Sequence, residues 1–234
     1  MSMMKSQVAS LLGLTLAILF FSGAHAAKIT FTNNCPNTVW PGTLTASKAS
    51  RSVDAPSPWS GRFWGRTRCS TDAAGKFTCE TADCGSGQVA CNGAGAVPPA
   101  TLVEITIAAN GGQDYYDVSL VDGFNLPMSV APQGGTGECK PSSCPANVNK
   151  VCPAPLQVKA ADGSVISCKS ACLAFGDSKY CCTPPNNTPE TCPPTEYSEI
   201  FEKQCPQAYS YAYDDKNSTF TCSGGPDYVI TFCP

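Results

Sequence analysis

Short stretches of alternating hydrophobic and polar residues recur along the chain, and this alternation is typical of half-buried β-strands. Lys28 to Thr32 alternates in this way, and so does Leu102 to Ile107. In the second stretch, Val103, Ile105 and Ile107 share one face, which we expect to pack in the core. The opposite, outward face carries Leu102, Glu104 and Thr106.

Two further strands are predicted in the second half of the chain. Tyr115 to Val121 is a strand candidate that ends at the Asp122-Gly123 turn, and Asp227 to Phe232 has the pattern of a closing strand. Strands at such short spacing favour an antiparallel sandwich or a flattened barrel, so the predicted fold class is mainly β.

Between Cys139 and Cys205 the alternation fades, and prolines and cysteines accumulate. Two short helices are predicted there, Cys168 to Phe175 and Tyr197 to Gln204, the second with Thr195 as its N-cap. The chain contains 20 prolines and 20 glycines, which leave little room for long helices. This region therefore predicts a disulfide-stapled subdomain with little core of its own.

The N-terminus has the features of a secretory signal peptide over residues 1–26. Lys5 provides a positive charge, Leu11 to Phe21 is apolar, and Ala24-His25-Ala26 has the small-x-small pattern of a cleavage site. A membrane anchor or a buried helix is the alternative, but an apolar run of about eleven residues is short for a bilayer, which takes roughly twenty. We therefore expect export from the cell and a mature chain of residues 27–234.

Cleavage would change the available chemistry, because His25 is the only histidine. Without it, catalytic systems of the Ser-His-Asp or Cys-His type have no base, and zinc sites that contain histidine cannot form. The formal net charge of the chain is −3 and no basic run is present. Nucleic acid is therefore not expected as a partner.

All 16 cysteines follow the predicted cleavage site, and an even number in an oxidising compartment favours disulfides. Zinc binding is the alternative, but no C-x2-C pair occurs, and the adjacent Cys181 and Cys182 are poorly arranged to bind one ion. We therefore expect eight disulfides, no metal and no cofactor. The count alone leaves the pairing open.

A set of motifs is spread over residues 27–234. They are Gly75-Lys76-Phe77-Thr78-Cys79-Glu80-Thr81-Ala82-Asp83-Cys84 with Gly87 and Cys91, Trp64-Gly65-Arg66-Thr67, Val121-Asp122-Gly123-Phe124-Asn125, Tyr180-Cys181-Cys182 and Phe232-Cys233-Pro234. Together with the order of the cysteines, these motifs resemble thaumatin-like proteins, the pathogenesis-related family 5 of plants, and among them the fruit-allergen type.

The resemblance implies a thaumatin-like flattened β-sandwich in three parts. These would be a sandwich core of residues 27–66, 98–145 and 206–234, a hairpin lobe of residues 67–97 and a disulfide-rich lobe of residues 146–205. The implied disulfides are Cys35–Cys233, Cys69–Cys79, Cys84–Cys91, Cys139–Cys222, Cys144–Cys205, Cys152–Cys168, Cys172–Cys181 and Cys182–Cys192.

One stretch departs from the family pattern. Between Trp40 and Pro58 the chain is shorter than in the family, as though a strand and its turn near Thr45-Ala46 were missing. The sequence therefore leaves the early sandwich strands and one sheet edge undetermined.

The resemblance also implies an acidic ligand-binding cleft. Its members would be Arg62, Glu104, Asp117, Asp122 and Asp214, with Phe124 and Tyr213 as aromatic faces for stacking. The alternation points Glu104 away from the core and Asp122 lies at a strand end, but alternation alone does not place Asp117 beside Asp122. A solvated surface position is the alternative for each carboxylate, and core packing is the alternative for both Phe124 and Tyr213.

These residues and the resemblance lead us to expect a secreted plant defence protein, monomeric and antifungal, in the apoplast or the vacuole. It would bind β-1,3-glucan or another fungal-wall polysaccharide, with the fungal membrane as a further target. The first alternative is a weak endo-β-1,3-glucanase with Glu104 as general acid and Asp117 or Asp122 as base or nucleophile, since glycoside hydrolysis needs two carboxyl groups. The second alternative is a non-catalytic stress or storage protein. Asn186 and Asn217 lie in glycosylation sequons.

Overall fold

A computed structural model describes residues 26–43 and 52–234. The predicted signal peptide, apart from Ala26, and the shortened stretch near Thr45-Ala46 lie outside these residues. Within the described part of the chain, no helix is long and apolar enough to cross a membrane. The fold is mainly β, as predicted, with strands in two principal sheets.

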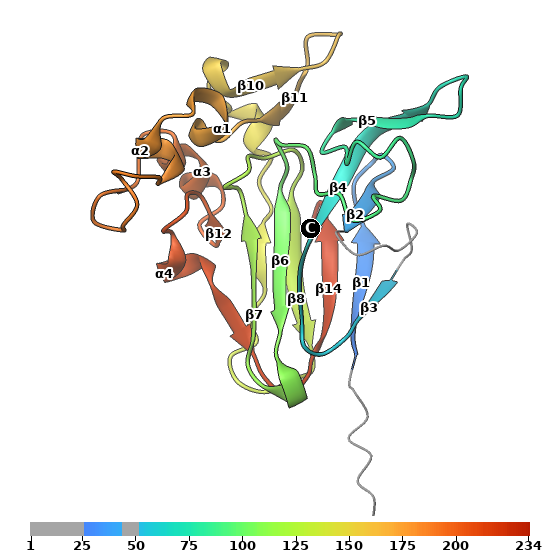
Figure 1. Cartoon of the computed structure of the whole chain (residues 1–234), viewed down its shortest axis with the longest axis vertical. Coiled ribbons are helices and arrows are strands. Elements are labelled where there is room, and N and C mark those ends of the chain that lie inside the picture. Colours follow the sequence, from blue (N-terminus) through green and yellow to red (C-terminus); the bar gives the residue numbers. More distant parts are fainter. Residues whose placement is uncertain (1–25, 44–51) are drawn as a thin grey trace, which may run out of the picture.

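The first sheet has five strands in the order β3-β1-β14-β8-β9 (Figure 1). The strands are β1 (Ala27–Asn33), β3 (Ser52–Ala55), β8 (Met128–Gln133), β9 (Ser142–Cys144) and β14 (Asp227–Phe232). The strands predicted near Lys28 and at Asp227 to Phe232 are therefore confirmed. They pair in parallel, which alternation cannot reveal, and Cys35–Cys233 joins the segments that follow them.

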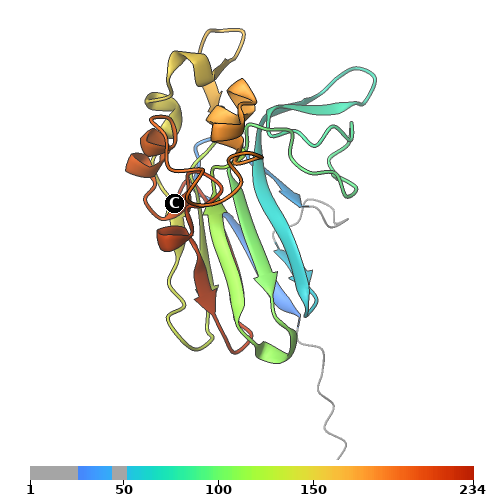
Figure 2. The ribbon, with the colours of Figure 1, turned by 60° about the vertical axis from the view of Figure 1, so that its left-hand side comes forward.

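The second sheet has the order β12-β7-β6-β4-β2, with β13 also paired to β7 and β5 to β4. The strands are β2 (Trp40–Thr43), β4 (Trp59–Thr71), β5 (Phe77–Thr81), β6 (Leu102–Ile107), β7 (Asp114–Ser119), β12 (Ala208–Tyr209) and β13 (Phe220–Cys222). Strand β6 has the predicted bounds. Strand β7 begins one residue before the prediction and ends at Ser119, before the turn. In Figure 2, β1 lies behind β4 and β6, so the sheets form two layers.

The core lies between the two sheets. Val103, Ile105 and Ile107 are buried there, as the alternation of β6 predicts. Leu102 was expected on the outer face, but it is only 4% exposed. It packs with Trp64 in a second, smaller cluster that includes cysteines of the hairpin lobe, so the lobe covers this end of the strand.

The hairpin lobe is tied to the second sheet by a buried arginine. Arg66 is 0% exposed, and its guanidinium donates to the carbonyl oxygens of Trp40 at 3.3 Å, Pro41 at 3.1 Å and Val89 at 2.7 Å. Its charge also lies over the ring of Phe77, 5.3 Å from the centroid. A planar, multidentate donor suits such a cluster of carbonyl groups, which explains an arginine inside the fold.

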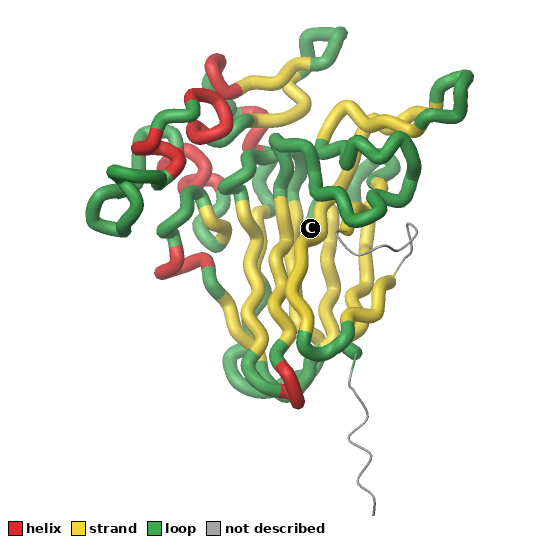
Figure 3. The backbone as a smooth tube through the Cα atoms, viewed as in Figure 1, coloured by secondary structure: helices red, strands yellow, loops and turns green. Residues whose placement is uncertain are grey.

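Most helices gather at one end of the sandwich, and η1 (Ala109–Gly111) lies at the other end, between β6 and β7 (Figure 3). The other 3-10 helices are η2 (Val148–Lys150) and η3 (Ala154–Leu156). The α-helices are α1 (Ala171–Phe175), α2 (Ser178–Cys181), α3 (Ser198–Gln204) and α4 (Asp215–Ser218). A short hairpin of β10 (Gln157–Lys159) and β11 (Val165–Cys168) lies beside η3 and α1 in the chain. Helix α1 begins later than predicted because Cys168 ends β11 and Ser170 caps the helix. Helix α3 begins at Ser198, whose amide donates to Thr195 Oγ1 at 3.4 Å.

Eight disulfides hold this arrangement, and each joins the two cysteines that the family resemblance implies. No free cysteine occurs among the residues that the structure describes. The stretch predicted to be shortened joins β2 to β3, and these strands end different sheets in the described part of the fold.

Candidate functional site

Three ionisable side chains form one row across the neighbouring strands β4, β6 and β7. In the register of the sheet, Arg62 is opposite Glu104, and Glu104 is opposite Asp117. Side chains at directly opposite positions project from the same face, here the outer one, because their neighbours Val103 and Val118 are buried in the core. The register thus places Asp117 beside Glu104, which alternation alone could not do.

An ion pair links this row to the end of β7. Arg62 Nε lies 2.6 Å from Glu104 Oε1, and Arg62 Nη1 lies 4.0 Å from Asp122 Oδ2. The turn that carries Asp122 requires a glycine at position 123. Gly123 has a φ of 91°, and the Cβ of any other residue there would lie 2.6 Å from the carbonyl oxygen of Cys168. The structure therefore brings four of the five predicted cleft residues together: Arg62, Glu104, Asp117 and Asp122.

The carboxyl group of Asp117 has a strongly altered proton affinity. Its Oδ1 atom is buried and has no hydrogen-bond partner among the described residues. Burial and the neighbouring charge of Glu104 raise the pKa of Asp117 to about 8, although the charge of Arg62 lowers it. Asp117 therefore carries a proton at neutral pH, beside a Glu104 that is ion-paired with Arg62.

An open groove of about 430 Å³ lies over this row. It is lined by Ser60, Gly61, Arg62, Glu104, Ile105, Thr106, Tyr115 and Asp117. Gly61 lies opposite the buried Ile105 and leaves room for Trp59 on the core side of β4, because a Cβ at this position would lie 2.3 Å from the indole ring. The groove thus combines charged, hydroxyl and aromatic groups on a rigid sheet surface.

Asp214 is not among the residues that line the groove. Its Oδ2 accepts hydrogen bonds from the amide and the hydroxyl of Ser210, at 2.9 and 2.7 Å. It also contacts Glu202 on α3, whose pKa is raised by burial and by the charge of Asp214 and a hydrogen bond with it. Through these contacts Asp214 holds the segment after β12 against α3.

The prediction that Phe124 is a stacking residue of the cleft is wrong. It is 0% exposed and packs in the core, because the turn at Gly123 reverses the chain and its backbone then pairs with Cys168 at 2.8 Å in both directions. The exposed aromatic residue of the groove is Tyr115, which is 49% exposed. The alternation of β7 could have identified Tyr115 as an outward residue, because the adjacent Tyr116 points into the core.

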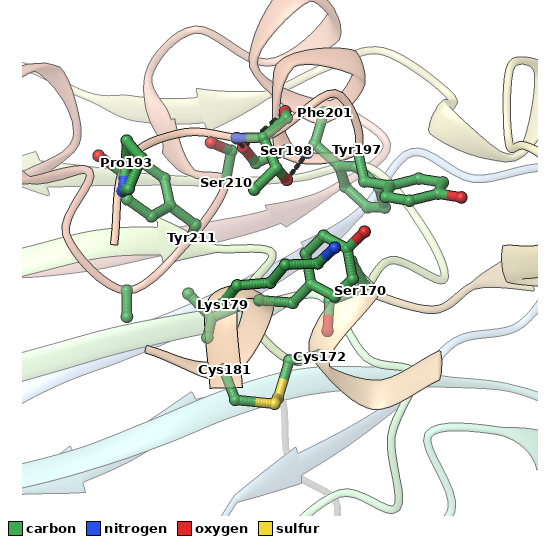
Figure 4. Close-up of a pocket in the computed structure, with 15 residues that line it drawn as sticks. Ser170, Cys172, Lys179, Cys181, Pro193, Tyr197, Ser198, Phe201, Ser210 and Tyr211 are labelled. Carbon is green, nitrogen blue, oxygen red and sulfur yellow. Dashed lines mark hydrogen bonds between the residues drawn. A yellow bond between two sulfur atoms is a disulfide. The ribbon is translucent and has the colours of Figure 1, made fainter. Parts of the chain in front are cut away.

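A second, small cavity of about 50 Å³ lies in the helical end of the molecule. Figure 4 shows Tyr197 and Ser198 on one side of it and the Cys172–Cys181 disulfide on the other, with Lys179 between them. The Lys179 ammonium lies over the Tyr180 ring, 4.6 Å from its centroid. The cavity is mostly apolar, and it separates α3 from the first two helices.

The two predicted glycosylation sites differ in exposure. Asn186 is partly buried, and its side-chain amide lies 2.9 Å from the hydroxyl of Ser178. Asn217 is exposed on α4, while the next residue, Ser218, is buried. A glycan has more room at Asn217.

Known proteins match most of this chain. The sequence profile of the thaumatin family matches residues 33–234. The chain is 94% identical to thaumatin-like protein 1a of Malus domestica over 246 aligned positions, which cover 99% of this chain and 100% of that protein. It is 68% identical to a Prunus avium protein named glucan endo-1,3-beta-glucosidase, with coverage of 99% and 100%. It is 51% identical to pathogenesis-related protein 5 of Arabidopsis thaliana, with coverage of 89% and 91%.

The alignment with the Malus domestica protein is longer than the 234 residues of this chain, so that relative has residues that this chain lacks. Among solved structures, the fold is similar to a laminaripentaose-producing β-1,3-glucanase of glycoside hydrolase family 64 from Paenibacillus barengoltzii. The TM-score is 0.57 at 11% identity, with coverage of 90% of this chain and 75% of that chain. At this identity the similarity concerns the fold alone.

Proposed function

Because the chain belongs to the thaumatin family, which includes pathogenesis-related plant defence proteins that are generally secreted, we propose that it is a secreted antifungal protein that binds β-1,3-glucan of fungal walls. The proposed binding site is the groove over β4, β6 and β7. The name of the Prunus avium relative, which refers to a β-1,3-glucan bond, supports this choice of polysaccharide.

The observation that carries the proposal is the row of Arg62, Glu104 and Asp117 on the floor of an open groove. A β-1,3-glucan offers many hydroxyl groups and no charge. The guanidinium of Arg62 donates hydrogen bonds, the carboxylate of Glu104 accepts them, and a protonated Asp117 does both. Such a row of fixed polar groups suits a neutral, hydroxyl-rich chain.

The test is binding to laminarin, a soluble β-1,3-glucan, measured by isothermal titration calorimetry. The double variant Glu104→Gln with Asp117→Asn should bind about tenfold more weakly, because a hydrogen bond to a charged group such as Glu104 contributes about 1.5–3 kcal/mol. The matched control is Glu80→Gln with Asp162→Asn, which removes two exposed carboxylates that pair with Arg68 outside the groove. Equal laminarin affinity in both double variants would overturn the proposed site.

Hydrolysis of the glucan is the second candidate function. The raised pKa of Asp117, about 8, beside the ion pair of Glu104 favours it, because a glycosidase needs one protonated and one ionised carboxyl group. The geometry favours Asp117 as general acid and Glu104 as base or nucleophile, the reverse of the roles expected from the sequence. Release of reducing ends from laminarin should disappear in Asp117→Asn and fall as the pH rises through about 8. Turnover retained by Asp117→Asn would refute these roles.

A further inference from the structure

A second row of side chains runs beside the charged row on the same face of the sheet. Ser60 on β4 is opposite Thr106 on β6, and Thr106 is opposite Tyr115 on β7. The row continues on β13, where Thr221 is opposite Tyr115. All four side chains carry a hydroxyl group and none carries a charge, so this row differs chemically from its neighbour.

Tyr115 provides the aromatic surface in this row. Its neighbours in β7, Asp114 and Tyr116, are each 1% exposed, so the strand directs Tyr115 outward, where it is 49% exposed. Beside it, Ser60 Oγ and Thr106 Oγ1 lie 2.9 Å apart and share a hydrogen bond. A pyranose has apolar faces and a hydroxyl-bearing edge, so an exposed ring next to two hydroxyls complements both.

The two rows define a direction along the sheet. Strand β6 passes Glu104 and then Thr106 on its way to η1, and β7 returns past Tyr115, Asp117 and finally Asp122 at the end near the lobes (Figure 1). The hydroxyl row is thus the one farther from the lobes. Because a strand rises about 3.3 Å per residue, the two rows are roughly 6–7 Å apart, which a chain of linked sugars spans.

Resting on the proposed function, we propose that the glucan chain lies along strands β6 and β7, from the lobes outward, and that Tyr115 stacks on a sugar beyond the charged row. The ligand class is therefore a linear β-1,3-gluco-oligosaccharide of two or more sugars, long enough to span the roughly 6–7 Å between the two rows.

The test measures the affinity for a hexamer of β-1,3-linked glucose by isothermal titration calorimetry. Tyr115→Ala should weaken hexamer binding about tenfold, the effect of losing one aromatic stacking surface. Tyr115→Phe, which keeps the ring, should bind the hexamer as the natural protein does. Tyr115→Thr, which suits an exposed strand, provides a second variant without the ring.

The matched control is Phe175→Ala in the disulfide-rich lobe, which removes an aromatic side chain of similar exposure, 44%, outside the groove. Its affinity for the hexamer should not change. If Tyr115→Ala and Tyr115→Thr bind the hexamer normally while Asp117→Asn binds it weakly, Tyr115 is not a subsite and the proposed function stands. If neither Tyr115 nor Asp117 matters for hexamer binding, both proposals fail.

Discussion

Replacing Asp117 by asparagine should remove a pH dependence from the free energy of unfolding. In the fold, burial and the neighbouring Glu104 raise the pKa of Asp117 to about 8, against the opposing charge of Arg62. In the unfolded chain an aspartate titrates near pH 4. At any pH between these values the folded protein holds a proton that the unfolded chain releases.

The sign and the size of the effect follow from this difference of one proton. Stability is greatest below the pKa of the unfolded chain, and it falls as the pH rises toward the pKa of the folded state. The slope is about 1.4 kcal/mol per pH unit, so the free energy of unfolding should fall by roughly 3 kcal/mol between about pH 5 and pH 7. Asparagine has nearly the same shape as aspartate and does not titrate, so Asp117→Asn should lack this contribution.

The assay is equilibrium unfolding in guanidinium chloride with the disulfides intact, measured at several pH values across that interval. The quantity of interest is the difference in slope between the natural protein and Asp117→Asn. Asp122→Asn, which removes a more exposed carboxylate near the same arginine, is the control and should keep the natural slope. Parallel pH profiles for the natural protein and Asp117→Asn would refute a buried, protonated Asp117.

Three further results are expected. Arg66→Lys should lower the free energy of unfolding by about 2–3 kcal/mol in denaturant titration, because a lysine cannot serve all the buried carbonyl groups; an unchanged midpoint would contradict this. Phe124→Leu should reduce stability by about 1 kcal/mol without weakening laminarin binding, whereas a loss of affinity in the folded variant would return Phe124 to the cleft. Replacing Cys35 and Cys233 together by alanine should cost about 4 kcal/mol, since this bridge closes a separation of 198 residues, and a loss below about 1 kcal/mol would speak against that explanation.

The strand faces could be predicted from the sequence because they depend on alternation within a single segment. The alternation of β6 identifies Val103 and Ile105 as core residues and Glu104 as an outward one, and the structure agrees. The partner of Glu104 could not be obtained in this way. It depends on the register between β6 and β7, which is set by the connection between them and by the packing of both strands on the other sheet.

Proximity in sequence was misleading near the site. Phe124 follows Asp122 by two residues, yet the left-handed backbone of Gly123 sends its side chain into the core. Leu102 alternates as an outward residue but is covered by the hairpin lobe, a contact between distant segments that no local pattern contains. The disulfide pairing likewise came from the resemblance to a family, because the cysteine spacing leaves it open.

The parallel pairing of β1 with β14 has a consequence for the order of assembly. β1 is the first strand described and β14 the last, yet they are neighbours inside the five-stranded sheet. A chain synthesised from its N-terminus therefore holds its first strand without this neighbour until the final residues have emerged. A product that stops before Asp227 would lack the middle strand of that sheet and the cysteine that closes it. Premature termination before β14 would therefore leave the sheet in two parts, β3-β1 and β8-β9.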